Sequence, residues 1–175
     1  SASGTHKIID ERKLNTVCAW ARCPNQAECY GKGRATFLLL GTVCTRQCRF
    51  CNIAHGMPDA VDETEIDRIV DAVTQLQLRH VVLTSVTRDD LPDNGARHFS
   101  RVIHAVRTAR PHCTIEVLTP DFHGDFTAAD IVIEARPHVF NHNVETIRRL
   151  YTEVRPGADY DRSLALLAYV KDRSC

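Results

Sequence analysis

The chain has 175 residues, the length of one domain or of part of a larger one. Its composition, 43% hydrophobic and 25% charged, is typical of a globular chain and argues against disorder. Lys+Arg and Asp+Glu both number 22, so charge gives no reason to expect binding to nucleic acid or to an anionic membrane. The longest apolar run, residues 35–43, is far too short to cross a bilayer.

Eight cysteines are many for this length, and six of them form two tight triplets. No signal peptide is recognisable at the start, which favours a reducing compartment. The first residue is not methionine, so we expect the sequence to be part of a longer gene product. Clustered thiols in that setting suit metal sites better than disulfides. Of the two single cysteines, Cys113 is expected to be a small core residue and Cys175 a terminal thiol.

The first triplet lies in an N-terminal extension, residues 1–34. After a polar lead-in over residues 5–15, the extension carries Cys18, Cys23 and Cys29 in the spacing C-x4-C-x5-C. A Pro-Asn turn at residues 24–25 indicates an irregular segment. Trp20, the only tryptophan, is expected to cover this segment by packing rather than to act in chemistry.

The second triplet follows a predicted strand over residues 35–43. Cys44, Cys48 and Cys51 have the spacing C-x3-C-x2-C. A structural zinc site needs four ligands, and a four-iron cluster held by protein alone needs four cysteines. The nearest histidine, His55, lies in a loop and is not an obvious fourth ligand. The motif therefore predicts a centre with one position open to a ligand that is not cysteine.

Helices and strands alternate through the rest of the chain. Hydrophobic periodicity predicts helices over residues 63–78, 95–110, 126–135, 144–151 and 160–170, and strands over residues 80–86, 114–118 and 138–140. This alternation is typical of an α/β fold with parallel strands. We expect a partial TIM-like (β/α) barrel of about four βα units over residues 35–175, preceded by the irregular cysteine-rich segment.

In such a fold ligands bind at the carboxyl ends of the strands. Polar residues follow the second predicted strand (Ser85, Arg88, Asp89, Asp90) and the fourth (Asn141, Asn143, Glu145). They are candidates for binding a cofactor or substrate. The alternatives are an Asx-type turn after the second strand and a helix N-terminus that favours Glu145 after the fourth. The glycines form no nucleotide-binding fingerprint.

The C-x3-C-x2-C motif, placed at the end of the first strand with Phe50 before its last cysteine, resembles that of the radical S-adenosylmethionine enzymes. The resemblance implies a four-iron cluster on Cys44, Cys48 and Cys51, whose open iron is chelated by S-adenosylmethionine. In these enzymes the reduced cluster donates one electron and breaks the sulfonium carbon–sulfur bond of S-adenosylmethionine. The resulting 5′-deoxyadenosyl radical abstracts hydrogen from an unactivated carbon. The resemblance further implies that the residues in contact with S-adenosylmethionine are among Phe50, Ser85, Asp90, Asn141, Asn143 and Glu145.

The first triplet and the sequence blocks at residues 33–37, 84–93, 115–122 and 139–146 are similar to those of the lipoyl synthase family. That family inserts two sulfur atoms at carbons 6 and 8 of an octanoyl chain. The chain is linked to a lysine of a lipoyl carrier domain or of the glycine-cleavage H protein. The resemblance implies that Cys18, Cys23 and Cys29 hold a second four-iron cluster, which donates the sulfur.

The resemblance also implies partners and a compartment. They are an electron donor such as ferredoxin or flavodoxin, an iron–sulfur carrier, and the bacterial cytoplasm or the mitochondrial matrix. The family's Arg-Ser-Ser-Tyr-like segment, which supplies a serine ligand, has no counterpart before the chain ends at residue 175. We therefore expect a fragment, a truncated form or one piece of a split protein. Two alternatives stay open, a metal-binding or electron-transfer module without catalysis and a different radical enzyme.

Overall fold

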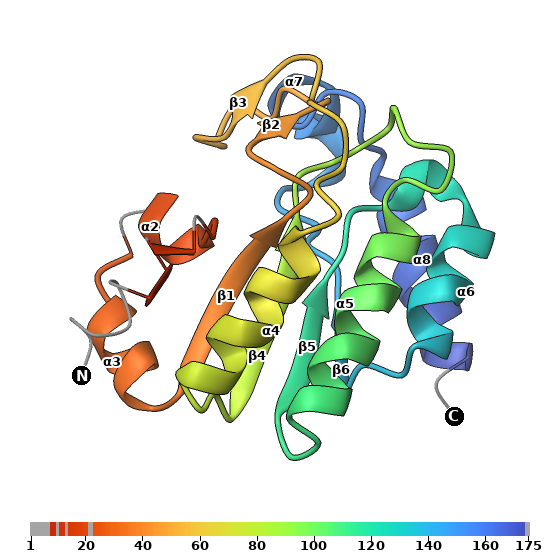
Figure 1. Cartoon of the computed structure of the whole chain (residues 1–175). Helices are drawn as coiled ribbons and strands as arrows, with labels where there is room; N and C mark the ends of the chain where they lie inside the picture. The colour runs from red at the N-terminus through yellow and green to blue at the C-terminus, as the bar shows by residue number, and fades with distance from the viewer. Residues whose placement is uncertain (1–7, 10, 13, 21–22, 174–175) are drawn as a thin grey trace.

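The structure is a computed structural model that describes residues 8–9, 11–12, 14–20 and 23–173 (Figure 1). The expectations for the Trp20 side chain and for Cys175 lie outside the described part. No helix within these ranges is long and apolar enough to cross a membrane.

The core of the fold is a four-stranded sheet in the order β1-β4-β5-β6, with every neighbouring pair parallel. Its strands are β1 (Arg34–Leu39), β4 (His80–Ser85), β5 (Thr114–Leu118) and β6 (Val139–Asn141). The helices between and after them are α4 (Glu65–Gln75), α5 (Ala96–Ala109), α6 (Phe126–Glu134) and α8 (Tyr160–Arg173). In Figure 1 these helices cover one face of the curved sheet. The predicted α/β fold with parallel strands is confirmed.

Burial explains why these segments form these elements. The central strand β4 buries Val81 and Leu83 completely, as expected for a strand covered by helices. Along α5, Phe99, Val102 and Ile103 recur at helical spacing and are also completely buried. The sheet and the helices thereby share one continuous hydrophobic core.

The N-terminal segment packs against the outer edge of β1. It contains two short helices, α2 (Val17–Trp20) and α3 (Gln26–Gly31), so it is more regular than the sequence indicates. The Leu38 N–H donates to the carbonyl of Asn15 at 2.8 Å, and Thr16 forms an antiparallel bridge with Phe37. Ile9, Leu14 and Tyr30 join the main core. This edge of the sheet is therefore partly covered by the cysteine-bearing segment.

The first strand is shorter than predicted. It ends at Leu39 because Leu40 (φ 67°) and Gly41 (φ 93°) adopt left-handed backbone, which breaks a strand. The chain then forms β2 (Val43–Cys44), which pairs in parallel with β3 (Ala54–His55) in a separate two-stranded sheet. The apolar sequence continues through the break, so hydropathy alone does not reveal it.

One further expectation is wrong. The helix predicted over residues 144–151 is replaced by irregular backbone, the 3-10 helix η2 (Arg148–Leu150) and the short helix α7 (Tyr151–Val154). Glu145 has a φ of 67°, which an α-helix does not tolerate. The connection between β5 and α6 contains a 3-10 turn, η1 (Phe122–Gly124).

Gly95 at the start of α5 is a sensitive position. It has a φ of 85°, and an added Cβ would lie 2.4 Å from Cδ1 of Leu40. We expect Gly95→Ala to lower the free energy of unfolding by at least about 1–2 kcal/mol, measured by urea denaturation. Gly31→Ala is the matched control, because Gly31 is helical and its added Cβ meets nothing within 4 Å. Equal effects of the two substitutions would contradict this account.

Candidate functional site

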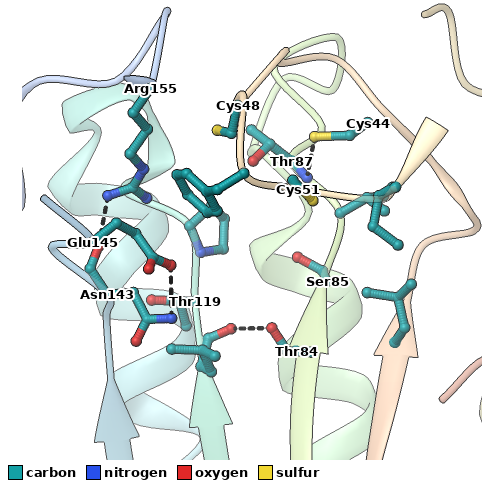
Figure 2. A pocket seen from close by; sticks show the side chains of 16 residues that line it. Cys44, Cys48, Cys51, Thr84, Ser85, Thr87, Thr119, Asn143, Glu145 and Arg155 are labelled. Atoms are coloured by element: carbon teal, nitrogen blue, oxygen red, sulfur yellow. Dashed lines mark hydrogen bonds between the residues drawn. The ribbon is translucent and has the colours of Figure 1, made fainter. Parts of the chain in front are cut away.

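A cavity of about 670 Å³, counting its open mouth, lies at the carboxyl ends of β1, β4 and β5 (Figure 2). All three cysteines of the second triplet line it. This position agrees with the rule that ligands bind at the carboxyl end of a parallel barrel. The lining consists of Leu38, Cys44, Cys48, Phe50, Cys51, Ile53, Thr84, Ser85, Val86, Thr87, Leu118, Thr119, Pro120, Asn143, Glu145 and Arg155.

The cysteine loop is anchored on two sides. On one side, the Thr45 N–H and hydroxyl both donate to the Thr87 carbonyl, at 3.1 Å and 3.0 Å. On the other side, the Arg49 N–H donates to the carbonyl of Val154, in α7, at 2.9 Å. Backbone hydrogen bonds therefore hold the loop between the segment after β4 and the segment after β6.

The Cys44 sulfur accepts two backbone hydrogen bonds. The Arg46 N–H lies 3.4 Å from it. The Thr87 N–H lies 3.3 Å from it, the contact drawn in Figure 2. Hydrogen bonds to cysteine sulfurs are also a feature of iron–sulfur clusters, where they tune the reduction potential. Burial raises the pKa of the Cys48 thiol, and the Arg155 guanidinium opposes this rise. Without a bound metal, burial thus favours the neutral Cys48 thiol.

The three thiols share one cavity without converging on a single point. Within the described ranges, no three His, Cys, Asp or Glu side chains are grouped closely enough to hold a metal ion. A four-iron cluster binds each thiolate through a different iron, so its ligands stand further apart than those of a single ion. The three-cysteine donor set, the N–H groups at sulfur and the neighbouring cavity fit such a cluster.

Four of the predicted cofactor-binding residues line the cavity, namely Phe50, Ser85, Asn143 and Glu145. The Ser85 hydroxyl is buried there and has no hydrogen-bond partner, although a buried polar group ordinarily has one. The Asn143 amide donates to the Glu145 carboxylate at 2.9 Å (Figure 2). The Ser85 hydroxyl is therefore available to a bound ligand.

The other two predicted residues lie outside the cavity lining. Asp90 receives two bonds of 2.8 Å from Arg88, which also donates to the carbonyls of Leu40 and Asp59. The Asn141 amide donates to Glu116 at 2.6 Å, within the sheet. Both side chains are engaged in holding the strand ends, so the structure does not bring them to the cavity.

The first triplet also lies apart from this cavity. Cys18, Cys23 and Cys29 are all partly exposed, and none of the three lines the cavity. The Cys23 N–H donates to the Cys18 carbonyl at 3.0 Å, which brings the backbones of these two residues together.

Sequence reasoning missed Arg155. Its guanidinium lines the cavity, where it donates to the Asn143 carbonyl at 2.6 Å and to the Tyr151 hydroxyl at 3.0 Å. The residue follows α7, between the helices predicted over residues 144–151 and 160–170, and no motif marks it. Thr84 and Thr87 also line the cavity; the sequence marks them only as members of the block at residues 84–93, with no role assigned.

Comparison with known families identifies the class of protein. The model of the Radical SAM superfamily, the radical S-adenosylmethionine enzymes, matches residues 38–175. The chain therefore belongs to this superfamily, as the C-x3-C-x2-C motif predicts.

Among individual proteins, the lipoyl synthase of Methylococcus capsulatus is 51% identical over 168 residues, which are 95% of this chain and 52% of that protein. The chain thus spans about half the length of this curated relative. A crystal structure of methylornithine synthase (PylB) superposes with a TM-score of 0.58 at 13% identity, covering 99% of this chain and 52% of that one. This second likeness concerns the fold alone.

Removal of two neighbouring hydroxyls, those of Thr84 and Ser85, should affect the free energy of unfolding differently. The Thr84 hydroxyl donates to the Leu118 carbonyl at 2.8 Å, whereas the buried Ser85 hydroxyl has no partner. We expect Thr84→Val to lower the free energy of unfolding by about 0.5–1.5 kcal/mol, and Ser85→Ala to leave it unchanged or raise it. Urea denaturation of the two variants checks this, and a larger loss for Ser85→Ala would contradict it.

The buried His142 should make stability depend on pH. Its ring nitrogens bond the Thr119 carbonyl at 2.9 Å and the Ser163 hydroxyl at 3.0 Å, and burial lowers its pKa. The unfolded chain then takes up the proton first as pH falls. Stability is fully present above the unfolded pKa of about 6.5 and declines below it, by at most about 1.4 kcal/mol per pH unit.

Urea denaturation between pH 7.5 and 5.5 measures this decline. We expect His142→Gln to flatten the pH profile, whereas the exposed His104→Gln serves as the control and should keep it. A wild-type profile that is flat over this range would overturn the assignment.

Proposed function

We propose that this chain is the cluster-binding part of a lipoyl synthase, which inserts two sulfur atoms at carbons 6 and 8 of an octanoyl chain on a carrier-protein lysine. One observation carries the proposal: a radical S-adenosylmethionine region is preceded by a second cysteine triplet, within a segment 51% identical to a lipoyl synthase over 95% of the chain. The triplet at Cys18, Cys23 and Cys29 lies upstream of the matched region, residues 38–175.

In this proposal Cys44, Cys48 and Cys51 hold the radical cluster, and its fourth iron is left to S-adenosylmethionine. When bound, these groups supply the one-electron chemistry that breaks an unactivated C–H bond, a step outside the reach of protein acids and bases. The amino-acid end of S-adenosylmethionine carries an ammonium and a carboxylate. Arg155 matches the carboxylate, and Glu145 on the same lining matches the ammonium.

The remaining lining suits the uncharged part of the chemistry. Leu38, Phe50, Ile53, Val86 and Leu118 give the cavity apolar surface beside the cysteines. Such surface excludes water from a reactive radical and accommodates an alkyl chain. The Ser85 hydroxyl lies among them as a buried group for hydrogen bonding to the cofactor. In this proposal Asp90 and Asn141 act indirectly, by holding the strand ends.

Cys18, Cys23 and Cys29 are proposed to hold the second four-iron cluster, which is consumed as the sulfur donor. The carrier substrate is an octanoylated lipoyl domain or the glycine-cleavage H protein. Electrons come from ferredoxin or flavodoxin, and an iron–sulfur carrier renews the consumed cluster. The reducing compartment is the cytoplasm of a bacterium or the mitochondrial matrix.

Metal content after anaerobic reconstitution tests the cluster assignment. We expect a brown protein with about eight iron atoms per chain, four for each cluster. Cys44→Ala and Cys23→Ala should each remove about four. Cys113→Ala is the control, because Cys113 is buried directly before β5 and belongs to neither triplet. This variant should retain all the iron. A colourless protein loaded with zinc would contradict the proposal.

Turnover separates lipoyl synthesis from other radical reactions. The assay supplies S-adenosylmethionine, a reductant and an octanoyl-lysine peptide to the complete gene product that contains this chain. The expected products are 5′-deoxyadenosine and a peptide that has gained two sulfur atoms. Release of 5′-deoxyadenosine without a gain in peptide mass would identify a different radical enzyme.

A further inference from the structure

The cysteine loop contains a buried cation that is not a ligand. Arg46 lies between Cys44 and Cys48, and its side chain is only 4% exposed. Its neighbour Arg49, in the same loop, is 68% exposed. Burial of a charged side chain is costly unless the charge is paired, so the surroundings of Arg46 need an explanation.

The Arg46 guanidinium bonds carboxylates from two other loops. It donates to both oxygens of Asp89, at 2.7 Å and 2.8 Å, and to Asp121 at 2.7 Å. Asp121 is itself fully buried and accepts a further bond from Arg162 at 3.3 Å. Two carboxylates and two guanidinium groups thereby balance their charges inside the protein.

These bonds connect loops that are distant in sequence. Asp89 follows β4 and Asp121 follows β5, while Arg46 follows β1 and β2. The Asp89 N–H also donates to the Thr45 hydroxyl at 3.2 Å, which ties the two loops together beside the guanidinium. A Cβ on Gly157 would lie 3.5 Å from Cδ of Arg46, so the segment after α7 packs against the same side chain.

The chemistry of this contact requires arginine. Burying the guanidinium costs free energy, and the hydrogen bonds that it donates to Asp89 and Asp121 offset that cost. Three bonds to two carboxylates use the planar fork of the guanidinium, which a lysine ammonium lacks. A buried ion pair adds little stability compared with an apolar contact, so its value here is the geometry that it imposes.

We propose that Arg46 is a positioning residue that holds the cysteine loop in its cluster-binding shape before any iron is present. It acts through the backbone of Thr45 and Cys44, because it fixes the path of the loop between the segments after β4 and β5. The loop then loses less conformational freedom when a cluster forms. The inference rests on the proposed role of Cys44, Cys48 and Cys51.

Hydrogen exchange of the iron-free chain tests the positioning without any cluster. We expect the amides of Thr45 and Arg49 to exchange at least tenfold faster in Arg46→Lys than in the wild type, whereas Arg49→Lys leaves the Thr45 amide unchanged. Amides of β5 report global stability and should not respond. Asp89→Asn removes the partly exposed partner and should reproduce the effect if Arg46→Lys does not fold. Unchanged loop amides in Asp89→Asn, or loop and β5 amides accelerated alike, would overturn the proposal.

Iron retention links the loop to the cluster. After reconstitution, a chelator should remove the iron held by Cys44, Cys48 and Cys51 at least fivefold faster from Asp89→Asn than from the wild type or Arg49→Lys. Loop amides that accelerate without faster iron loss would show a structural role only and refute the inference. If the wild type takes up no iron at these cysteines, the proposed function fails, whatever the exchange data show.

Discussion

Parallel pairing of β1, β4, β5 and β6 is the constraint on which the cavity depends. In the register of the sheet, Leu39 lies beside Ser85, Thr84 beside Leu118, and Leu118 beside Asn141. The carboxyl ends of all four strands therefore lie at the same end of the sheet, and segments tens of residues apart in sequence meet there. The cysteine loop, Ser85 and Asn143 share a cavity because of this geometry, before any of their side chains interact.

The break after β1 separates the cysteine loop from the four-stranded sheet. The Leu40 N–H would be left unpaired by its left-handed turn, and the buried Glu65 carboxylate accepts it at 3.0 Å. His98 bonds the same carboxylate oxygen at 2.7 Å, so the turn is supported from α4 and α5 together. A strand that continued to residue 43 would carry the cysteines away from the carboxyl ends of the strands. The turn lets the chain fold back toward these strand ends, and there β2 pairs with β3.

The sequence predicts those features that follow from the order of the elements and from the residue types at the ends of strands. Strands that alternate with helices predict the parallel sheet, and polar residues at or shortly after the ends of strands predict Ser85 and Glu145 as residues near the cavity. Asp90 and Asn141 satisfy the same rule, yet their side chains turn toward Arg88 and Glu116, and only the folded partners determine that choice. Arg46 and Arg155 could not be found because their roles depend on tertiary contacts. The bond from Arg46 to Asp121 spans 75 residues.

The two arginines beside the cysteines differ in what their charges can reach. The charge of Arg46 is balanced by Asp89 and Asp121 within the protein. The hydrogen bonds of Arg155 go to a carbonyl and a hydroxyl, which are neutral, so its charge acts on the cavity that it lines. The Glu145 carboxylate lines the same cavity, and apolar walls strengthen both fields. A ligand with only one charge matches one of these groups and is repelled by the other, whereas a zwitterion matches both. This charge pattern is the one that the zwitterionic amino-acid end of the proposed cofactor would match.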